Sequence, residues 1–154
     1  MKIEEQLKKK FLYTKKKNLP KLVYFFFQFM KFKIRPRKLY SNWGIDLLIE
    51  DILKKNKQKG IYIDIGCHHP LINNNTYALY KKGWKGINVD LDFSSIDMFN
   101  YFRPRDNNFV AALSNKEGQA NLYFFHNRAP KNTISKQRGK GAKSIKKIKV
   151  DTLD

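Results

Sequence analysis

The stretch GIYIDIGCHHP, residues 60–70, decides how this sequence is interpreted. Gly60 interrupts the chain, and the apolar run after it has the near-continuous character of a parallel strand that is covered on both faces. This strand ends at Asp64 and Gly66, directly before a Cys-His-His-Pro turn. An acid, a thiol and two imidazoles beside a turn fit a metal site, a reactive cysteine or a cofactor-binding loop. The rest of the chain has to decide between these three.

Turn and cap signals around this stretch divide the middle of the chain into helices and strands. Apolar residues at helical spacing predict helices, and short apolar runs between Gly, Pro and Asn predict strands. Ser94 or Ser95 is expected to cap one of these helices. The expected elements are a helix over 41–56, a strand over 61–65, a helix over 75–84, a strand over 85–92, a helix over 94–102, and strands over 108–114 and 119–126. This order predicts a doubly wound α/β sheet.

The chain of 154 residues carries a formal net charge of +19, and this charge lies on two flanks. Residues 1–40 hold 13 Lys or Arg against two Glu, and residues 127–149 hold 9 with no acid. Residues 41–126 are nearly neutral, with 10 bases and 9 acids. Recognition of nucleic acid needs a basic patch on the folded domain. We therefore favour a solvated lysine-rich surface and expect no specific nucleic acid as a partner.

The first 40 residues form a basic, aromatic extension ahead of the domain at 41–154. Their apolar run LVYFFFQFM (22–30) is flanked by lysines and is too short to cross a membrane. Runs of this kind lie in anionic membrane interfaces, and they also form helices that pack on their own domain or on a partner chain. We favour the packed helix, which should end before Pro36. Peripheral membrane contact through 1–40 is the alternative.

The cysteine and the two histidines of the turn are expected to have structural roles and not to bind a metal or act as a nucleophile. His68 and His69 are adjacent and cannot easily face one metal ion, so no metal site is expected. Cys67, the single cysteine, needs an organised base to act as a nucleophile, and we expect it to pack in the loop. One cysteine excludes an internal disulfide and fits a reducing compartment. With no secretory signal evident, we expect a cytoplasmic protein, or one that is peripheral to a membrane.

Acids follow two of the predicted strands at their carboxyl ends, where open α/β sheets bind ligands. Gly66 lets the backbone approach a ligand closely. Asp90 lies 26 residues after Asp64, near the place where a carboxylate holds a ribose diol. The pattern G-x-G-x-x-G is absent, and Asp64 would repel a pyrophosphate. A nucleoside cofactor with a cationic group, such as S-adenosylmethionine, fits best; the alternative is that Asp64 and Asp90 cap the helices after them.

Four motifs occur in order along the chain: YIDIGCHHP, NTYALYKKGWKGINVDLD, FRPRDNNFVAALS and NTISK. Together they make residues 41–154 resemble the FkbM-type methyltransferases, which are S-adenosylmethionine-dependent O-methyltransferases with a Rossmann-like fold. The resemblance implies a cofactor site whose first loop contains Asp64, Gly66 and Cys67, whose ribose ligand is Asp90, and whose adenine neighbours are Ala112, Leu113 and Ser114.

The chain departs from the family pattern in two places. In the family a strand with an acidic D-x-E-G motif follows, and KVDTLD (149–154) looks like the segment that leads toward it. Leu91 and Asp92 stand where the family commonly has a proline-containing turn. We therefore expect a Rossmann-like methyltransferase domain truncated after its first three parallel strands, with an N-terminal helical extension. Such a domain should have an open sheet edge and exposed apolar surface.

The resemblance implies methyl transfer from S-adenosylmethionine to a hydroxyl of a sugar or of another small metabolite. No residue stands out as the catalytic base. Because the sheet edge is open and the acceptor side of the family's site is missing, the isolated chain is expected to be inactive and prone to self-association, or to need a missing C-terminal half. The alternative function is a non-enzymatic basic module that binds a membrane surface or RNA through residues 1–40 and 127–149. A nicotinamide enzyme is disfavoured by the missing glycines.

Overall fold

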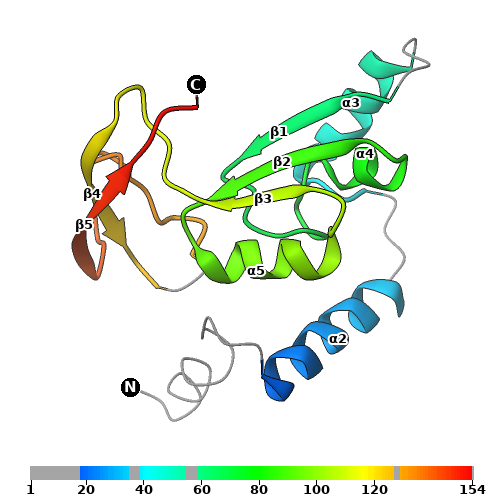
Figure 1. The fold of residues 1–154 in the computed structure, drawn as a ribbon, viewed down its shortest axis with the longest axis horizontal. Helices are drawn as coiled ribbons and strands as arrows, with labels where there is room; N and C mark the ends of the chain where they lie inside the picture. The colour runs from blue at the N-terminus through cyan, green and yellow to red at the C-terminus, as the bar shows by residue number, and fades with distance from the viewer. Residues whose placement is uncertain (1–17, 35–38, 55–58, 127–128, 154) are drawn as a thin grey trace.

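The structure is a computed structural model of the chain, and it describes residues 18–34, 39–54, 59–126 and 129–153. Figure 1 shows the order of its elements along the chain. These are α2 (Leu19–Ile34), the 3-10 helix η1 (Asn42–Gly44), α3 (Ile45–Leu53), β1 (Ile61–Ile65), α4 (Tyr77–Lys81), β2 (Lys85–Asp90), α5 (Phe93–Phe102), β3 (Asn107–Val110), β4 (Gly118–Phe124) and β5 (Ser144–Val150).

The centre of the fold is a parallel three-stranded sheet in the order β1-β2-β3. Its register places Ile63 opposite Ile87, and Val89 opposite Phe109. Helix α4 lies in the connection between β1 and β2, and α5 in the connection between β2 and β3. The prediction of an α/β fold with three parallel strands is confirmed. The strands begin within one residue of the expected places because each is a short apolar run bounded by glycine or by polar turns, but β2 and β3 end earlier than expected, at Asp90 and Val110.

The helices that contact this sheet pack on one of its faces. Helix α5 lies on β2 and β3, α4 lies on β2, and α3 packs on α4. Tyr62 and Asn88 point to this face and are buried. The core on this side of the sheet contains Cys67, Ile96 and Phe99. Because strand side chains alternate between faces, every second residue of β1 points the other way.

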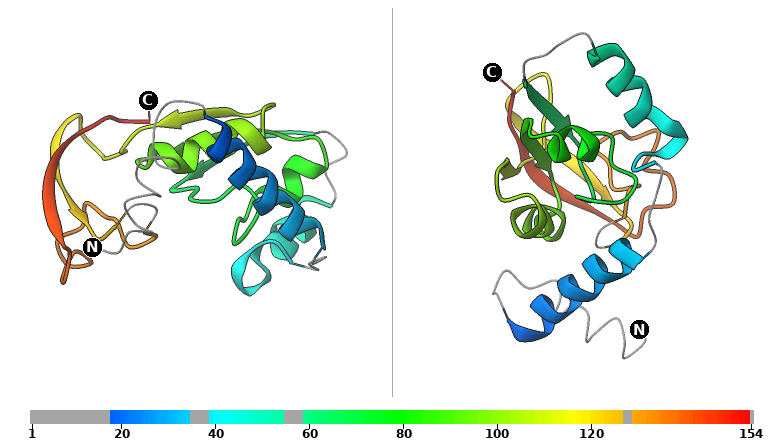
Figure 2. Two further views of the ribbon diagram at one scale, coloured as in Figure 1. Left: turned by 90° about the horizontal axis from the view of Figure 1, so that it is seen from below. Right: turned by 90° about the vertical axis from the view of Figure 1, so that its right-hand side faces the viewer.

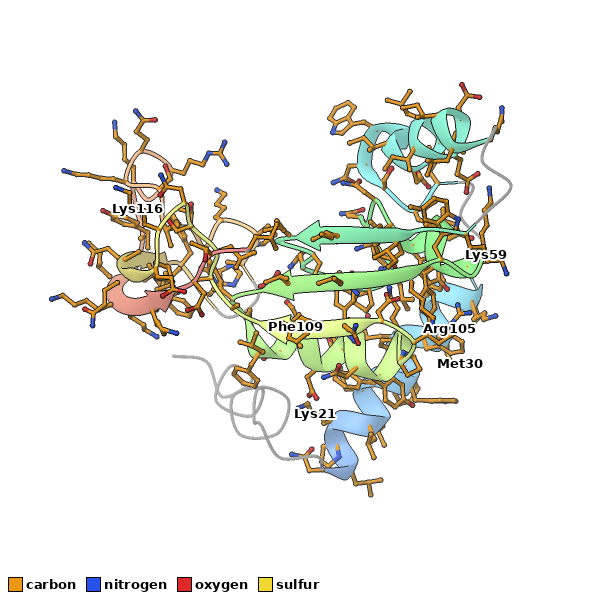
Figure 3. All side chains as sticks on the ribbon, turned by 45° about the horizontal axis from the view of Figure 1, so that its top comes forward. Lys21, Met30, Lys59, Arg105, Phe109 and Lys116 are labelled. Carbon is orange, nitrogen blue, oxygen red and sulfur yellow. The ribbon has the colours of Figure 1, made fainter. Side chains whose placement is uncertain are left out.

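The expectation that β1 is covered on both faces is wrong. Ile61, Ile63 and Ile65 are 72%, 50% and 56% exposed, and Phe109 on β3, labelled in Figure 3, is exposed on the same face. Among the described residues, no helix packs on this face, and β1 pairs with β2 alone. The apolar run therefore belongs to a strand with one exposed apolar face. This agrees with the expectation of exposed apolar surface and an open sheet edge.

The second sheet consists of β4 and β5, which pair antiparallel from Gly118 opposite Val150 to Phe124 opposite Ser144. It lies beyond the carboxyl ends of the parallel strands (Figure 1). A parallel bridge between Leu113 and Asp151 connects it to the segment after β3. Strand β4 was predicted, but β5 falls in the lysine-rich stretch 127–149 that the sequence assigned to solvated surface. Its lysines are exposed to solvent, and backbone pairing with β4 forms the strand.

The cap of α5 also differs from the prediction. The residue before the helix is Asp92, and its Oδ1 accepts a hydrogen bond from Ser94 N at 2.8 Å. Ser94 and Ser95 both lie inside the helix and are buried. A carboxylate that accepts a hydrogen bond from a backbone amide of the first turn is a common N-cap. The helix therefore starts one residue earlier than expected, and the two serines lie inside it.

The aromatic run of the extension forms α2, which packs on α5 as the favoured prediction stated. Lys21, labelled in Figure 3, is buried in an ion pair with Asp97. The ring of Phe25 lies 5.3 Å from that of Tyr101, and Phe29 stacks on Phe102 at 5.9 Å. Figure 2 shows α2 as a layer of its own against this side of the fold. None of the described helices is long and apolar enough to span a membrane.

Candidate functional site

A pocket of about 430 Å³ lies at the carboxyl ends of the parallel strands. The ends of β1 and β2, the segment after β3 and the loop between β4 and β5 enclose it. The residues that line it are Ile65, Gly66, His68, Val89, Asp90, Leu91, Asp92, Ser95, Ala111, Ala112, Leu113, Ala129, Pro130, Asn132, Thr133, Ile134 and Arg138. This is the position at which open α/β sheets bind their ligands.

Asp90 is the last residue of β2 and is held in place by two backbone amides. Its Oδ2 accepts from His68 N at 2.9 Å, and its Oδ1 accepts from Asp92 N at 2.8 Å. Burial raises the pKa of this carboxyl, although the two amide hydrogen bonds act in the opposite direction. The side chain is thus a fixed, largely desolvated acceptor on the wall of the pocket.

The backbone of the first loop supports this arrangement. Gly66 has φ +75° and His68 has φ +53°, both in the left-handed region. A Cβ at Gly66 would meet no atom within 4 Å, so the positive φ, and not a lack of space, favours glycine here. The unusual conformation of His68 costs about 1–2 kcal/mol for a residue with a side chain, and it turns His68 N toward Asp90. The loop therefore serves to orient the carboxylate.

Asp64 is predicted for the same site, but it does not line the pocket. Its Oδ2 accepts from Thr76 Oγ1 at 2.9 Å and from Asn74 Nδ2 at 3.2 Å. Both partners belong to the segment between the Cys-His-His-Pro turn and α4. Asp64 thus fastens this segment to the end of β1 from the helix-covered face of the sheet.

Cys67 lies in the core and not on the pocket wall. It is buried against Ile96 and Phe99. Burial raises the pKa of its thiol, and the charges of Asp90 and Asp64 raise it further. A thiol that stays protonated is a poor nucleophile, so the geometry fits the packing role that the sequence suggested.

The three residues predicted beside an adenine are only partly brought to the pocket. Ala112 and Leu113 line it, whereas Ser114 does not. The amide of Ser114 donates to the carbonyl of Asp151 at 2.9 Å, and so joins the bridge to the second sheet. Two of the three residues therefore line the pocket, and the third forms a backbone bond to the second sheet.

The loop between β4 and β5 contributes a wall that the sequence did not assign to the site. Asn132 Oδ1 accepts from Phe125 N at 2.9 Å, and Thr133 exchanges backbone hydrogen bonds with Tyr123. These bonds place Asn132, Thr133 and Ile134 across from the strand ends. The NTISK motif, which contributes to the family resemblance, was the sequence feature that could have identified this wall. Its spacing from the strand-end residues gave no reason to connect it with the site.

The two histidines have separate functions, and neither belongs to a metal cluster. His69 Nδ1 accepts from Leu71 N at 3.0 Å and from Ile72 N at 3.1 Å, which forms the turn at Pro70. His68 faces the pocket. The described part of the chain contains no group of three or more His, Cys, Asp or Glu that could hold a metal ion.

Comparison of the chain with protein-family models, with curated proteins and with solved structures finds no match.

Proposed function

We propose that the pocket binds S-adenosylmethionine and that the chain is the cofactor-binding part of an FkbM-like O-methyltransferase. The observation that carries this proposal is the position of Asp90, which ends a parallel strand at the edge of the pocket. In sites for nucleoside cofactors, a carboxylate at the end of the second strand accepts hydrogen bonds from the ribose hydroxyls.

The hydrogen-bonding capacity of Asp90 fits a ribose diol. An ionised carboxylate has about four acceptor positions, and the two backbone amides use one on each oxygen. One position remains on each oxygen for a hydroxyl donor. Ala112 and Leu113 supply an apolar wall on the side of β3, which suits the flat face of a purine.

The charges in the pocket favour a cationic cofactor over a pyrophosphate. Asp90 and Asp92 both line it, and Arg138 is the basic residue among the lining residues. In a dinucleotide site the pyrophosphate lies at the turn after the first strand, and the turn after β1 in this chain lacks the G-x-G-x-x-G pattern. The carboxylates of Asp90 and Asp92 would attract the amine and sulfonium of S-adenosylmethionine.

The reaction that this cofactor supports is methyl transfer to a hydroxyl. The acceptor oxygen attacks the methyl carbon, the bond from carbon to sulfur breaks, and the hydroxyl proton passes to a base, leaving S-adenosylhomocysteine. The protein contributes alignment of the two reactants and proton removal. We propose a sugar or another small hydroxylated metabolite as the acceptor, and we assign the base to no described residue.

The open face of the sheet supports a further part of this proposal. Ile61, Ile63 and Ile65 are exposed beside the edge of β1 that no described strand pairs with, and an apolar surface of this kind is normally covered. We propose that the acceptor side of the site is completed there by additional polypeptide. The 154-residue chain should then bind the cofactor without catalysing methyl transfer.

Isothermal titration calorimetry with S-adenosylmethionine, S-adenosylhomocysteine and NAD tests the proposal. Binding of the first two ligands and not of NAD is expected. Asp90→Ala should weaken the binding by about 1–3 kcal/mol, the scale for hydrogen bonds to a charged group. The matched control is Asp51→Ala, which removes an exposed carboxylate of α3.

Two results would overturn the assignment. The first is an affinity of Asp90→Ala equal to that of the unmodified chain. The second is tighter binding of NAD than of S-adenosylmethionine. A separate assay for release of S-adenosylhomocysteine with a panel of sugars tests the need for additional polypeptide, because turnover by a monomer of the chain alone would contradict it.

A further inference from the structure

Helix α2 carries large apolar side chains on two opposite sides. Its inner side packs on α5 through Lys21, Phe25 and Phe29. Its other side we call the outer face, and its residues follow at helical spacing: Leu19, Val23, Phe26, Phe27, Met30 and Ile34. All six are exposed, with Phe27 at 64%.

The outer face is not a by-product of packing on the domain. At 100° per residue its six members fall within a stripe about 100° wide, the width of the apolar stripe of an amphipathic helix. The inner side already supplies the contact to α5. Two exposed phenylalanines beside four aliphatic side chains form a contiguous apolar surface, and surfaces of this kind mark interaction sites.

The charge of this part of the chain restricts what can cover the outer face. Helix α2 contains no acidic residue. Residues 1–40, in which it lies, hold 13 Lys or Arg against two Glu. Two copies related by a twofold axis would bring the same basic segments together, which is electrostatically unfavourable. An anionic surface complements both the apolar stripe and the basic charge.

We propose that α2 binds anionic membrane surfaces and lies in the plane of the interface, with its outer face among the lipid headgroups and upper acyl chains. A helix of 16 residues is too short to span a bilayer, but apolar insertion plus basic attraction is sufficient for interfacial binding. The inner side keeps α5 and the sheet attached, so the whole domain is carried to the membrane. This inference does not depend on the methyltransferase proposal.

Co-sedimentation of the full chain with vesicles tests the inference. We expect binding to phosphatidylcholine vesicles that contain phosphatidylserine, and weak binding to phosphatidylcholine alone. Raising the salt concentration should weaken the binding, because the attraction of the basic residues is screened. The double variant Phe26→Ser/Phe27→Ser should lower the partition coefficient at least about tenfold, since it removes two large apolar groups from the inserted face.

The matched control is Phe109→Ser, which removes an equally exposed aromatic from the sheet and should bind as the unmodified chain does. A Phe27→Trp variant gives a direct readout, because insertion should shift its fluorescence emission to the blue. Circular dichroism confirms that each variant is folded. The substitutions lie on exposed positions, so the fold should be retained.

Three outcomes would overturn the inference. The first is no binding to anionic vesicles at low salt. The second is equal binding of the double variant and the unmodified chain, which would show that charge alone acts. The third is a concentration-dependent dimer in analytical ultracentrifugation that the double variant dissociates, without vesicle binding, which would assign the outer face to a second copy.

Discussion

The Nε of Arg103 lies 2.9 Å from Oδ2 of Asp106, and solvent reaches neither side chain. The same guanidinium donates to Asn74 Oδ1 and to Thr76 Oγ1, both at 3.0 Å. Asp106 in turn accepts from Gly86 N at 2.8 Å. This ion pair therefore joins the end of α5, the start of β2 and the segment before α4.

We predict that Arg103→Met unfolds the domain at markedly lower denaturant concentration. Removing one partner leaves the Asp106 carboxylate buried without its cation, and the expected loss is about 3–5 kcal/mol. Urea denaturation followed by circular dichroism measures it. The pair is buried and saturated with hydrogen bonds, so the penalty should vary little with salt.

The matched control is Arg105→Met, two residues further along the same turn. Arg105 is exposed, and its contacts are a hydrogen bond to the Tyr80 carbonyl and a position 4.3 Å above the Tyr80 ring. Its loss should destabilise the chain far less, because solvent weakens contacts at an exposed position. Equal destabilisation by the two substitutions would contradict a special role for the buried pair.

Gly86→Ala should be strongly destabilising. A β-carbon at Gly86 would overlap the ring of Tyr62 on the adjacent strand. That ring is fixed because its hydroxyl donates to Asp106 Oδ2 at 2.7 Å, so we expect a cost of about 1–3 kcal/mol or more from overpacking. Thermal unfolding measures the effect, and an unchanged melting temperature would show that the sheet yields at this point.

The thiol of Cys67 should be unreactive in the folded chain. Burial raises its pKa, and the thiolate is the reactive species, so reaction with Ellman's reagent at mildly alkaline pH should be at least about tenfold slower than in urea. The chain has a single cysteine, and Cys67→Ser provides the blank. Rapid reaction without denaturant would instead point to a nucleophile.

Cofactor affinity should fall as the pH is lowered through the raised pKa of Asp90. The ionised carboxylate accepts from both ribose hydroxyls, and protonation converts one acceptor into a donor. Burial raises this pKa above 3.8, so the loss begins at a higher pH than for an exposed Asp. Calorimetry between about pH 4 and 7 should show it for the unmodified chain. Asp90→Asn should bind weakly and without this dependence; a flat profile for the unmodified chain would remove Asp90 from the site.

Local patterns in the sequence were sufficient to locate the parallel strands and α5. Each strand is a short apolar run that ends in a polar turn, and such patterns depend only on neighbouring residues. The same reasoning missed β5, because five of its seven residues are exposed and give no buried face to recognise. It also gave no sign that Arg103 would be buried against Asp106.

Whether β1 is covered on one face or on two also could not be read from the chain. A run such as IYIDI is apolar in either case, and the exposure of Ile61 depends on which helices pack on the sheet. Helix packing is a long-range property, whereas propensity and periodicity are local. The sequence therefore determined the strand, and the tertiary structure decided its surroundings.

The two strand-end acids show the same division most clearly. The sequence by itself placed Asp64 and Asp90 at the ends of neighbouring parallel strands and identified both as candidates for one site. The register pairs Asp64 with Asn88 and Ile65 with Val89, so Asp90 is level with the residue after β1, and Asp64 lies two positions further inside the sheet. Asp90 consequently lines the pocket, and Asp64 bonds to Thr76. Register arises from pairing between segments distant in sequence, which is why only the tertiary structure could separate the two carboxylates.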